Sequence, residues 1–187
     1  MMCSIGIEVA LRCGHKVRAF TLSESDYALG MNLNFGEAIN KFFVKMRYDY
    51  GSKLRYMWIE HCQGDKVRKN RHVVCYGTGR LDTKELDSHW HKVYGSKVSG
   101  MEALWSPKGF AFYLAKYLSS GESFVRYRMS NGWVFQNWWQ FCLKVHRESG
   151  AYPDVSLLAE LSRMSKRDRD YERDWIINTG GMSHDYR

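Results

Sequence analysis

The chain has few of the features that mark secreted, membrane-spanning or linker-rich proteins. It carries only two prolines, Pro107 and Pro153, so it has no Pro-rich linker. Its five cysteines are an odd number at wide spacings and include no C-x-x-C pair, which argues against a cysteine zinc knuckle. No signal peptide is evident, and no apolar run approaches the ~18 residues that a membrane span needs. These absences favour a reducing, cytoplasmic setting without a membrane partner.

Aromatic and basic residues are what the chain does have. The 187 residues are 44% hydrophobic and 15% aromatic, enough to bury a core of domain size. Lys and Arg number 28 against 20 Asp and Glu, which gives a net charge of +8. A basic surface attracts polyanions, of which nucleic acid is the commonest. The charge alone is a weak indication, because many basic domains bind nothing acidic.

The order of elements predicts an α+β domain with a central, largely antiparallel sheet flanked by helices. Helical spacing and stop signals predict helices over 37–51, 82–95, 106–121, 136–150 and from 154 onward. Strand-like runs cover 17–23, 54–62, 71–77, 97–105 and 123–135, and a basic turn joins the second and third into a hairpin. Residues 1–16 have no strong period and are interpreted as an arm, and 23–36 as a polar loop.

A domain boundary is predicted at the Gly and Pro between 150 and 153. Residues 1–150 would form one domain. Residues 151–187 would form a helical, charge-rich extension, because the segment RMSKRDRDYERD carries a dense mixture of both charges.

Glu60 and His72 are the first candidates for chemistry. The predicted hairpin places them on neighbouring strands near its turn. A carboxylate and an imidazole together suit a divalent ion such as Mn²⁺ or Mg²⁺. The alternative is a histidine at the edge of the sheet that forms a hydrogen bond with a neighbour.

The segment YLAKY supplies the second candidates. On the predicted helix over 106–121, Tyr113 and Tyr117 share a face, and Lys116 lies on an adjoining part of it. A tyrosine hydroxyl with a pKa of ~10 is a poor nucleophile. A metal or a nearby cation makes its attack on a phosphate practicable. Taken alone, the same residues are more typical of helix packing.

The order of these segments resembles the HUH-family rolling-circle replication initiators encoded by plasmids and small single-stranded DNA phages. Their first motif is similar to FTLS at 20–23. Their second has two histidines around a bulky residue, often after a glutamate, and is similar to NRHVV at 70–74 after Glu60. Their third is similar to Tyr113, Lys116 and Tyr117. The resemblance covers roughly residues 17–135, and the order and spacing of its motifs are more specific than any one of them.

The resemblance implies an RRM/ferredoxin-like nuclease fold with a Mn or Mg ion on the sheet surface. It implies an endonuclease and strand transferase in which Tyr113, or alternatively Tyr117, attacks single-stranded DNA at a replication origin. A 5′-phosphotyrosine link and a free 3′-hydroxyl would result, and the reverse reaction would rejoin ends. Lys116 would orient or neutralise the phosphate.

The implied setting is the cytoplasm of a prokaryotic host, with the protein encoded by a plasmid or virus. Host polymerase would extend the 3′-hydroxyl, and a host helicase would unwind the duplex, because no G-x-x-x-x-G-K-[ST] motif occurs.

The chain departs from the family pattern at Asn70, which stands where a relative has the first histidine. Three interpretations follow. Asn70 could join Glu60 and His72 as a weaker ligand to a hard ion. His61 could replace the missing histidine, although strand alternation points it away from Glu60. The protein could also be a degenerate module that only binds nucleic acid.

Residues around this candidate site are expected to contact DNA. Thr21 and Ser23 share one face of the first strand, and the basic turn beside the proposed metal suits phosphate contacts. The predicted DNA-binding residues are Thr21, Ser23, Lys66, Arg68, Lys69 and Arg71.

Overall fold

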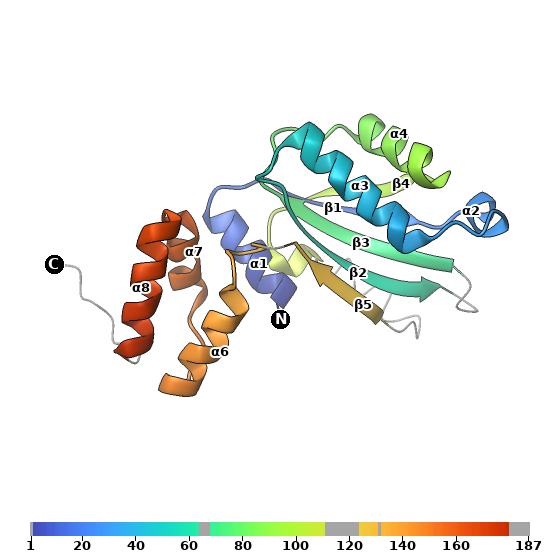
Figure 1. The fold of residues 1–187 in the computed structure, drawn as a ribbon. Helices are drawn as coiled ribbons and strands as arrows, with labels where there is room; N and C mark the ends of the chain where they lie inside the picture. The colour runs from blue at the N-terminus through green and yellow to red at the C-terminus, as the bar shows by residue number, and fades with distance from the viewer. Residues whose placement is uncertain (1, 64–67, 111–123, 131, 180–187) are drawn as a thin grey trace.

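The computed structural model describes residues 2–63, 68–110, 124–130 and 132–179 (Figure 1). These residues form an α+β protein with a five-stranded antiparallel sheet in the order β4-β1-β3-β2-β5, which confirms the predicted class. The strands are β1 (Val17–Ser23), β2 (Arg55–Gln63), β3 (Arg68–Tyr76), β4 (Val98–Leu104) and β5 (Phe124–Met129). The helices are α1 (Met2–Arg12), α2 (Asp26–Gly30), α3 (Phe35–Tyr50), α4 (Thr83–Tyr94), α6 (Trp138–Ser149), α7 (Val155–Arg163) and α8 (Lys166–Asn178).

Strands β2 and β3 form the predicted hairpin. Their register runs without interruption from Arg55 opposite Tyr76 to Gln63 opposite Arg68. Strand β1 pairs with β3 on one side and with β4 on the other, so β1 and β3 lie inside the sheet. Helix α3 connects β1 to β2 and α4 connects β3 to β4, and Figure 1 shows both helices over the same face of the sheet.

Strand alternation divides the sheet into two apolar faces. One face, called here the α3 face, carries Phe20, Leu22, Trp58, Val73 and Cys75 and packs beneath α3 and α4. Aromatic rings pack against this face, where Phe42 meets both Phe20 and Trp90 in T-shaped, edge-to-face contacts.

The opposite face, called here the α1 face, carries Ala19, Met57, Val74 and Tyr76. These residues belong to an apolar cluster that also includes residues of α1, α6, α7 and α8. Figure 1 places these four helices together at one end of the sheet.

The prediction of an N-terminal arm is wrong, because residues 2–12 form helix α1. Its Ile7, Val9 and Ala10 are at most 1% exposed. Gly6 permits a close approach, since a Cβ atom at this position would lie 1.9 Å from Nε1 of Trp133. The helix is buried on several sides and so lacks the single apolar stripe that marks a surface helix.

The predicted extension after residue 150 packs with the rest of the chain. A break does occur, because Gly150 ends α6 with φ of 76°. However, α7 contacts α1 and α8 contacts α6, and Leu158, Leu161 and Ile176 belong to the same apolar cluster as Val74. No helix in the described part of the chain is both long and apolar enough to cross a membrane.

Candidate functional site

His72 occupies the centre of β3, an inner strand of the sheet. It lies opposite Thr21 on β1, and its Nδ1 is 3.0 Å from the Thr21 hydroxyl oxygen. The imidazole is only 1% exposed. Both residues lie on the α1 face, because they alternate with Val73 and Phe20, which pack on the α3 face.

Asn70 is the next residue of β3 on that same face. It is paired with Ser23 on β1 and is 8% exposed. Asn70 and His72 lie toward the β2–β3 turn, whereas Val17 and Tyr76 lie at the other end of the strands, in the apolar cluster with α1. The structure therefore places the two neighbouring motif residues on one face, as expected.

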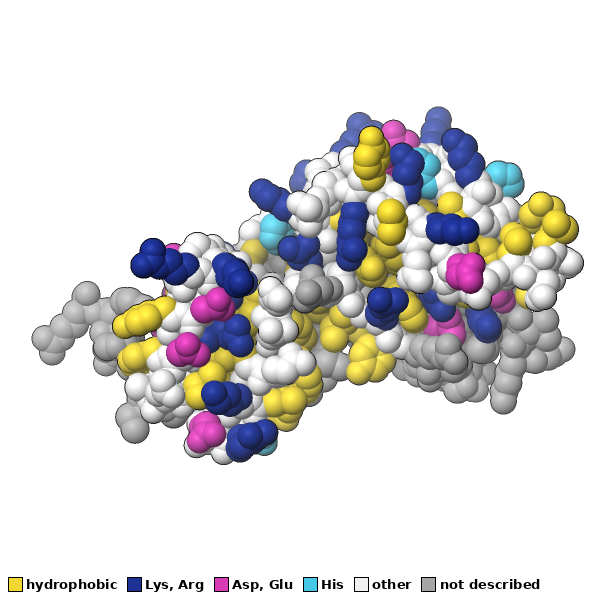
Figure 2. Space-filling view, viewed as in Figure 1, with side chains coloured by type: hydrophobic (Ala, Val, Ile, Leu, Met, Phe, Trp, Pro, Cys, Tyr) yellow, Lys and Arg dark blue, Asp and Glu magenta, His cyan; other side chains and the backbone are white. Residues whose placement is uncertain are grey.

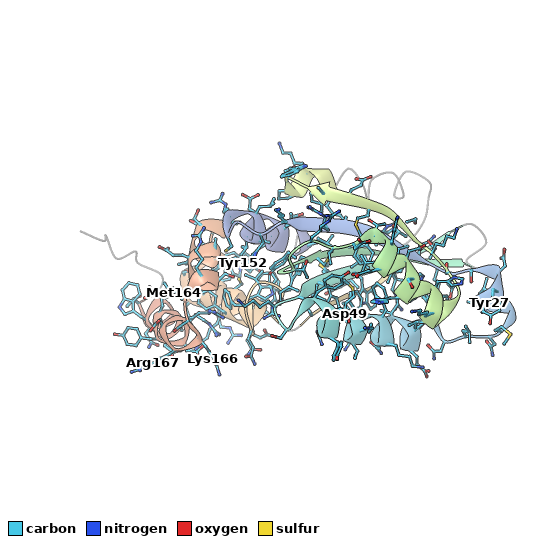
Figure 3. The ribbon with its side chains drawn as sticks, turned by 90° about the horizontal axis from the view of Figure 1, so that it is seen from above. Tyr27, Asp49, Tyr152, Met164, Lys166 and Arg167 are labelled. Atoms are coloured by element: carbon cyan, nitrogen blue, oxygen red, sulfur yellow. The ribbon has the colours of Figure 1, made fainter. Side chains whose placement is uncertain are left out.

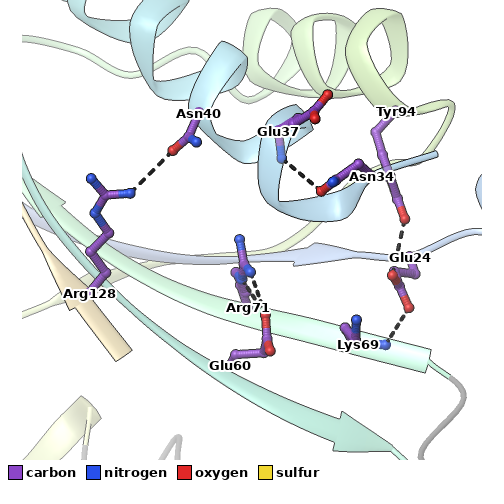
Figure 4. Close-up of polar contacts among 9 residues, drawn as sticks. All are labelled: Glu24, Asn34, Glu37, Asn40, Glu60, Lys69, Arg71, Tyr94 and Arg128. Carbon is purple, nitrogen blue, oxygen red and sulfur yellow. Dashed lines mark hydrogen bonds and ion pairs between the residues drawn. The ribbon is translucent and has the colours of Figure 1, made fainter. Parts of the chain in front are cut away.

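Glu60 does not join them. It lies opposite Arg71, on the α3 face, and its Oε2 accepts hydrogen bonds from Nε at 2.6 Å and Nη2 at 2.5 Å (Figure 4). Successive residues of a strand point to opposite faces, so Arg71 and His72 diverge and Glu60 follows Arg71. The predicted ligand set of Glu60, His72 and Asn70 is not brought together.

The Arg71 guanidinium is itself buried rather than part of an exposed basic turn. The residue is 6% exposed, and its charged group lies 4.1 Å from the Trp58 ring centroid and 4.7 Å from that of Phe35. A guanidinium held between a carboxylate and two rings beneath α3 is not accessible to a DNA phosphate. The expectation that Arg71 contacts DNA is therefore wrong.

The other predicted DNA-binding residues have mixed positions. Thr21 is buried against His72, and Ser23 is half-buried at the end of β1. Lys69 is exposed, and its backbone N–H donates to Glu24 Oε2 at 2.7 Å. Lys66 and the side chain of Arg68 lie outside the described part of the chain.

Glu24 holds the end of β1 in place near Asn70. Besides the Lys69 backbone contact, it accepts a hydrogen bond from the Tyr94 hydroxyl at 3.1 Å (Figure 4). Burial, together with the nearby Glu24 carboxylate, raises the pKa of Tyr94. This contact links α4 to the strand end that carries Ser23.

The candidate nucleophiles Tyr113 and Tyr117, together with Lys116, lie outside the described residues. The start of the segment predicted to be helical, residues 106–121, is described. Residues 107–110 are helical, and the Ser106 hydroxyl accepts from the Gly109 N–H at 3.3 Å, the contact that a capping serine makes. Phe110 is 3% exposed and belongs to the α1-face cluster with Ala19 and Val74. This helix therefore begins on the sheet face that carries His72.

His61 also has a defined backbone position. It lies opposite Asn70 in the β2–β3 register, so position 61 is one residue beyond Glu60 and alternates with it. Alternation assigns this position to the face of Asn70 and His72. Among the described residues, no group of three or more His, Cys, Asp or Glu side chains could hold a metal ion.

Comparison with known proteins adds no relative to this picture. No protein-family model, curated protein sequence or solved structure matches the chain.

Proposed function

We propose that the protein is a HUH-type endonuclease that nicks single-stranded DNA at a replication origin and later rejoins the ends. One observation carries the proposal. His72 lies on the same face of the sheet on which Phe110, three residues before Tyr113 in the sequence, is packed. The strand order β4-β1-β3-β2, with two crossing helices on the opposite face, supports the RRM/ferredoxin-like fold that the motifs imply.

The proposed chemistry is a reversible strand transfer. The Tyr113 oxygen attacks the phosphorus and forms a phosphotyrosine bond, while the bond from phosphorus to the 3′-oxygen breaks. The departing oxygen takes up a proton and becomes the 3′-hydroxyl, and the DNA 5′ end stays on the enzyme. Lys116 would stabilise charge on the phosphate, and Tyr117 is the alternative nucleophile. Host polymerase and helicase would act on the products in the cytoplasm of a prokaryotic host.

The donor set on the α1 face fits a divalent cation only in part. His72 and Asn70 place an imidazole and an amide oxygen on this face, whereas the Glu60 carboxylate lies on the other face and is paired with Arg71. We propose that His61, opposite Asn70, supplies the histidine that the motif lacks. When bound, Mn²⁺ or Mg²⁺ would polarise the non-bridging phosphate oxygens.

The contact with Thr21 bears on which ring nitrogen of His72 carries the proton when a metal binds. If Nε2 of His72 is the ligand atom, Nδ1 must carry the proton and donate it to the Thr21 hydroxyl. Thr21→Val would remove that acceptor. We expect the affinity for Mn²⁺, measured by titration calorimetry, to fall about 10–100-fold. Ser99→Ala, which changes a hydroxyl on the neighbouring strand β4, is the control.

A covalent adduct assay tests the function itself. Purified protein is mixed with Mn²⁺ and labelled single-stranded oligonucleotides covering candidate origins, and products are separated on a denaturing gel. The proposal expects a protein–DNA adduct that Tyr113→Phe abolishes and Glu60→Gln does not. An adduct that still forms with Tyr113→Phe but not with Tyr117→Phe would identify Tyr117 as the nucleophile.

A non-catalytic nucleic-acid-binding module of the same fold is the second candidate. It is favoured by the pairing of Glu60 with Arg71, which takes the expected carboxylate ligand away from His72. This alternative predicts that single-stranded DNA binds but that no ion yields an adduct.

A further inference from the structure

A cleft of about 880 Å³ opens at the end of the sheet away from the β2–β3 turn. Its walls come from the start of β2, the end of β3, the loop before α6, and helices α7 and α8. Tyr76 lines it, and lies about 13 Å further along β3 than His72 at the usual rise per residue. The cleft is therefore separate from the candidate site described above.

The lining of the cleft is strongly basic. It includes the cationic side chains Lys53, Arg55, Lys166, Arg169 and Arg173. Asp170 is the carboxylate among the lining residues, and it already lies 3.5 Å from an Arg173 nitrogen. Burial lowers the pKa of Arg169, with nearby Asp170 opposing the shift and Arg173 adding a smaller lowering effect. Figure 2 shows Lys and Arg side chains over both the sheet and the C-terminal helices.

Two arginines of the cleft are fixed in position by backbone carbonyls. Arg55 donates to the Ser52 and Leu54 carbonyls at 2.9 and 3.2 Å. Arg169 donates to the Leu161 and Met164 carbonyls at 2.7 and 2.8 Å. Guanidinium groups held in this way are preorganised for an anion, because less side-chain entropy is lost when it binds.

Two lysines differ from these arginines. Lys53 and Lys166 are exposed and form no ion pair with any described residue. They come from different parts of the chain, because Lys53 lies before β2 and Lys166 lies at the start of α8, where Figure 3 labels it. Their ammonium groups flank the cleft and can approach successive phosphates of a bound strand.

A flat aromatic surface lies beside these cations. The exposed His15 ring stacks on Tyr76, with ring centroids 5.2 Å apart and an angle of 30° between planes. Partial burial and the Lys53 cation lower the pKa of His15, which favours the neutral ring. A base can stack on such a ring whatever its identity, while hydroxyl and amide groups of Thr78 and Gln136 line the same cleft.

We propose that this cleft binds single-stranded nucleic acid, with its cations on the phosphates and His15 against a base. A cationic cleft with a stacking surface has the two components of a sequence-tolerant single-strand site. The proposal requires neither a metal ion nor Tyr113, so it holds whether or not the protein forms a covalent adduct.

Equilibrium binding without divalent ions tests this site. The anisotropy of a labelled deoxythymidine oligonucleotide is measured with the full chain at several salt concentrations. The variant Lys53→Ala with Lys166→Ala is compared with Lys41→Ala with Lys92→Ala, which removes the same charge from exposed positions of α3 and α4. If each cleft lysine contacts one phosphate, the slope of log affinity against log salt falls by about 1.4. The control pair keeps the original slope.

A second variant tests the stacking surface. His15→Ala should weaken oligonucleotide binding by about fivefold or more while leaving the salt slope unchanged, because a stacked base contributes no counterion release. Equal binding by the cleft and control lysine pairs would overturn the proposal. It would also be overturned if inorganic phosphate or a mononucleotide competed as well as an unlabelled oligonucleotide, because the cleft would then hold one phosphate group. If the protein forms the covalent adduct but the cleft variants do not change oligonucleotide binding, the cleft proposal is wrong and the proposed nicking function stands.

Discussion

At the scale of single side chains, the pairing of Glu60 with Arg71 determines which residues can act together with His72. Alternation along a strand is enough to place Glu60 on one face with Trp58 and His72 on one face with Val74. It did not supply the cross-strand register, which places Glu60 opposite Arg71. A charged side chain on a buried face needs a partner there, and the register supplies Arg71 to Glu60.

Removing the Glu60 carboxylate tests this assignment. Glu60→Ala should lower the free energy of unfolding in urea by roughly 3–5 kcal/mol, because it leaves the Arg71 guanidinium buried without its carboxylate. The double variant Glu60→Met with Arg71→Leu should recover much of that loss, since it removes both charges. Unchanged stability together with lost Mn²⁺ binding would instead return Glu60 to the metal site.

His72 shows where residue-scale prediction was incomplete. Its two interpretations were a metal ligand and a histidine bonded to a neighbour. The Thr21 contact supports the second without excluding the first, because a metal-binding histidine usually donates its other ring nitrogen to a fixed partner. Thr21 itself was expected to contact DNA, and only the pairing of β1 with β3 shows that it meets His72.

At the scale of elements, the sequence predicts the start of a helix well where a side chain caps it. The helix predicted over 82–95 is capped by Asp82, whose Oδ1 accepts from the Lys84 N–H at 2.7 Å. Helix α1 was missed because nothing in its sequence separates a buried face from an exposed one. Helix α2 was missed because five residues are too few for a periodic pattern to show.

The cap of α4 gives an element-scale prediction. Asp82→Ala should lower the free energy of unfolding by about 1 kcal/mol, because backbone N–H groups in the first turn lose their acceptor. Lys84→Ala, at an exposed position in the same turn, should change stability little. Both are measured by urea denaturation. Equal effects from the two variants would contradict a capping role for Asp82.

At the scale of the whole molecule, the C-terminal helices contribute to the core rather than trail from it. The mixed charges of 163–174 predicted a solvated helix face or tail, and they gave no sign of the apolar contacts that α8 makes. Arg173 covers the Phe135 and Phe141 rings at 5.8 and 5.3 Å. Long basic side chains can cover apolar surface while their charged groups reach water, which composition cannot reveal.

A truncation tests how far the core depends on these helices. A chain ending at residue 150 would lose Leu158, Leu161 and Ile176, each at most 3% exposed. Each such side chain contributes roughly 1.5–3 kcal/mol when fully buried. Their sum is comparable to the roughly 5–15 kcal/mol of a whole domain. We expect the truncated chain to lose its cooperative thermal transition, and an unchanged transition would restore residues 1–150 as an independent domain.

Strand β3 carries His72 near its middle and Tyr76 at its end, on the same face of the sheet. A paired inner strand cannot stretch, so the separation between the proposed nicking site and the cleft is fixed. Along a stacked strand at about 3.4 Å per nucleotide, that separation corresponds to about four nucleotides. If a single DNA strand occupied both places, the length of β3 between them would set the number of nucleotides between the cleaved bond and the segment held in the cleft.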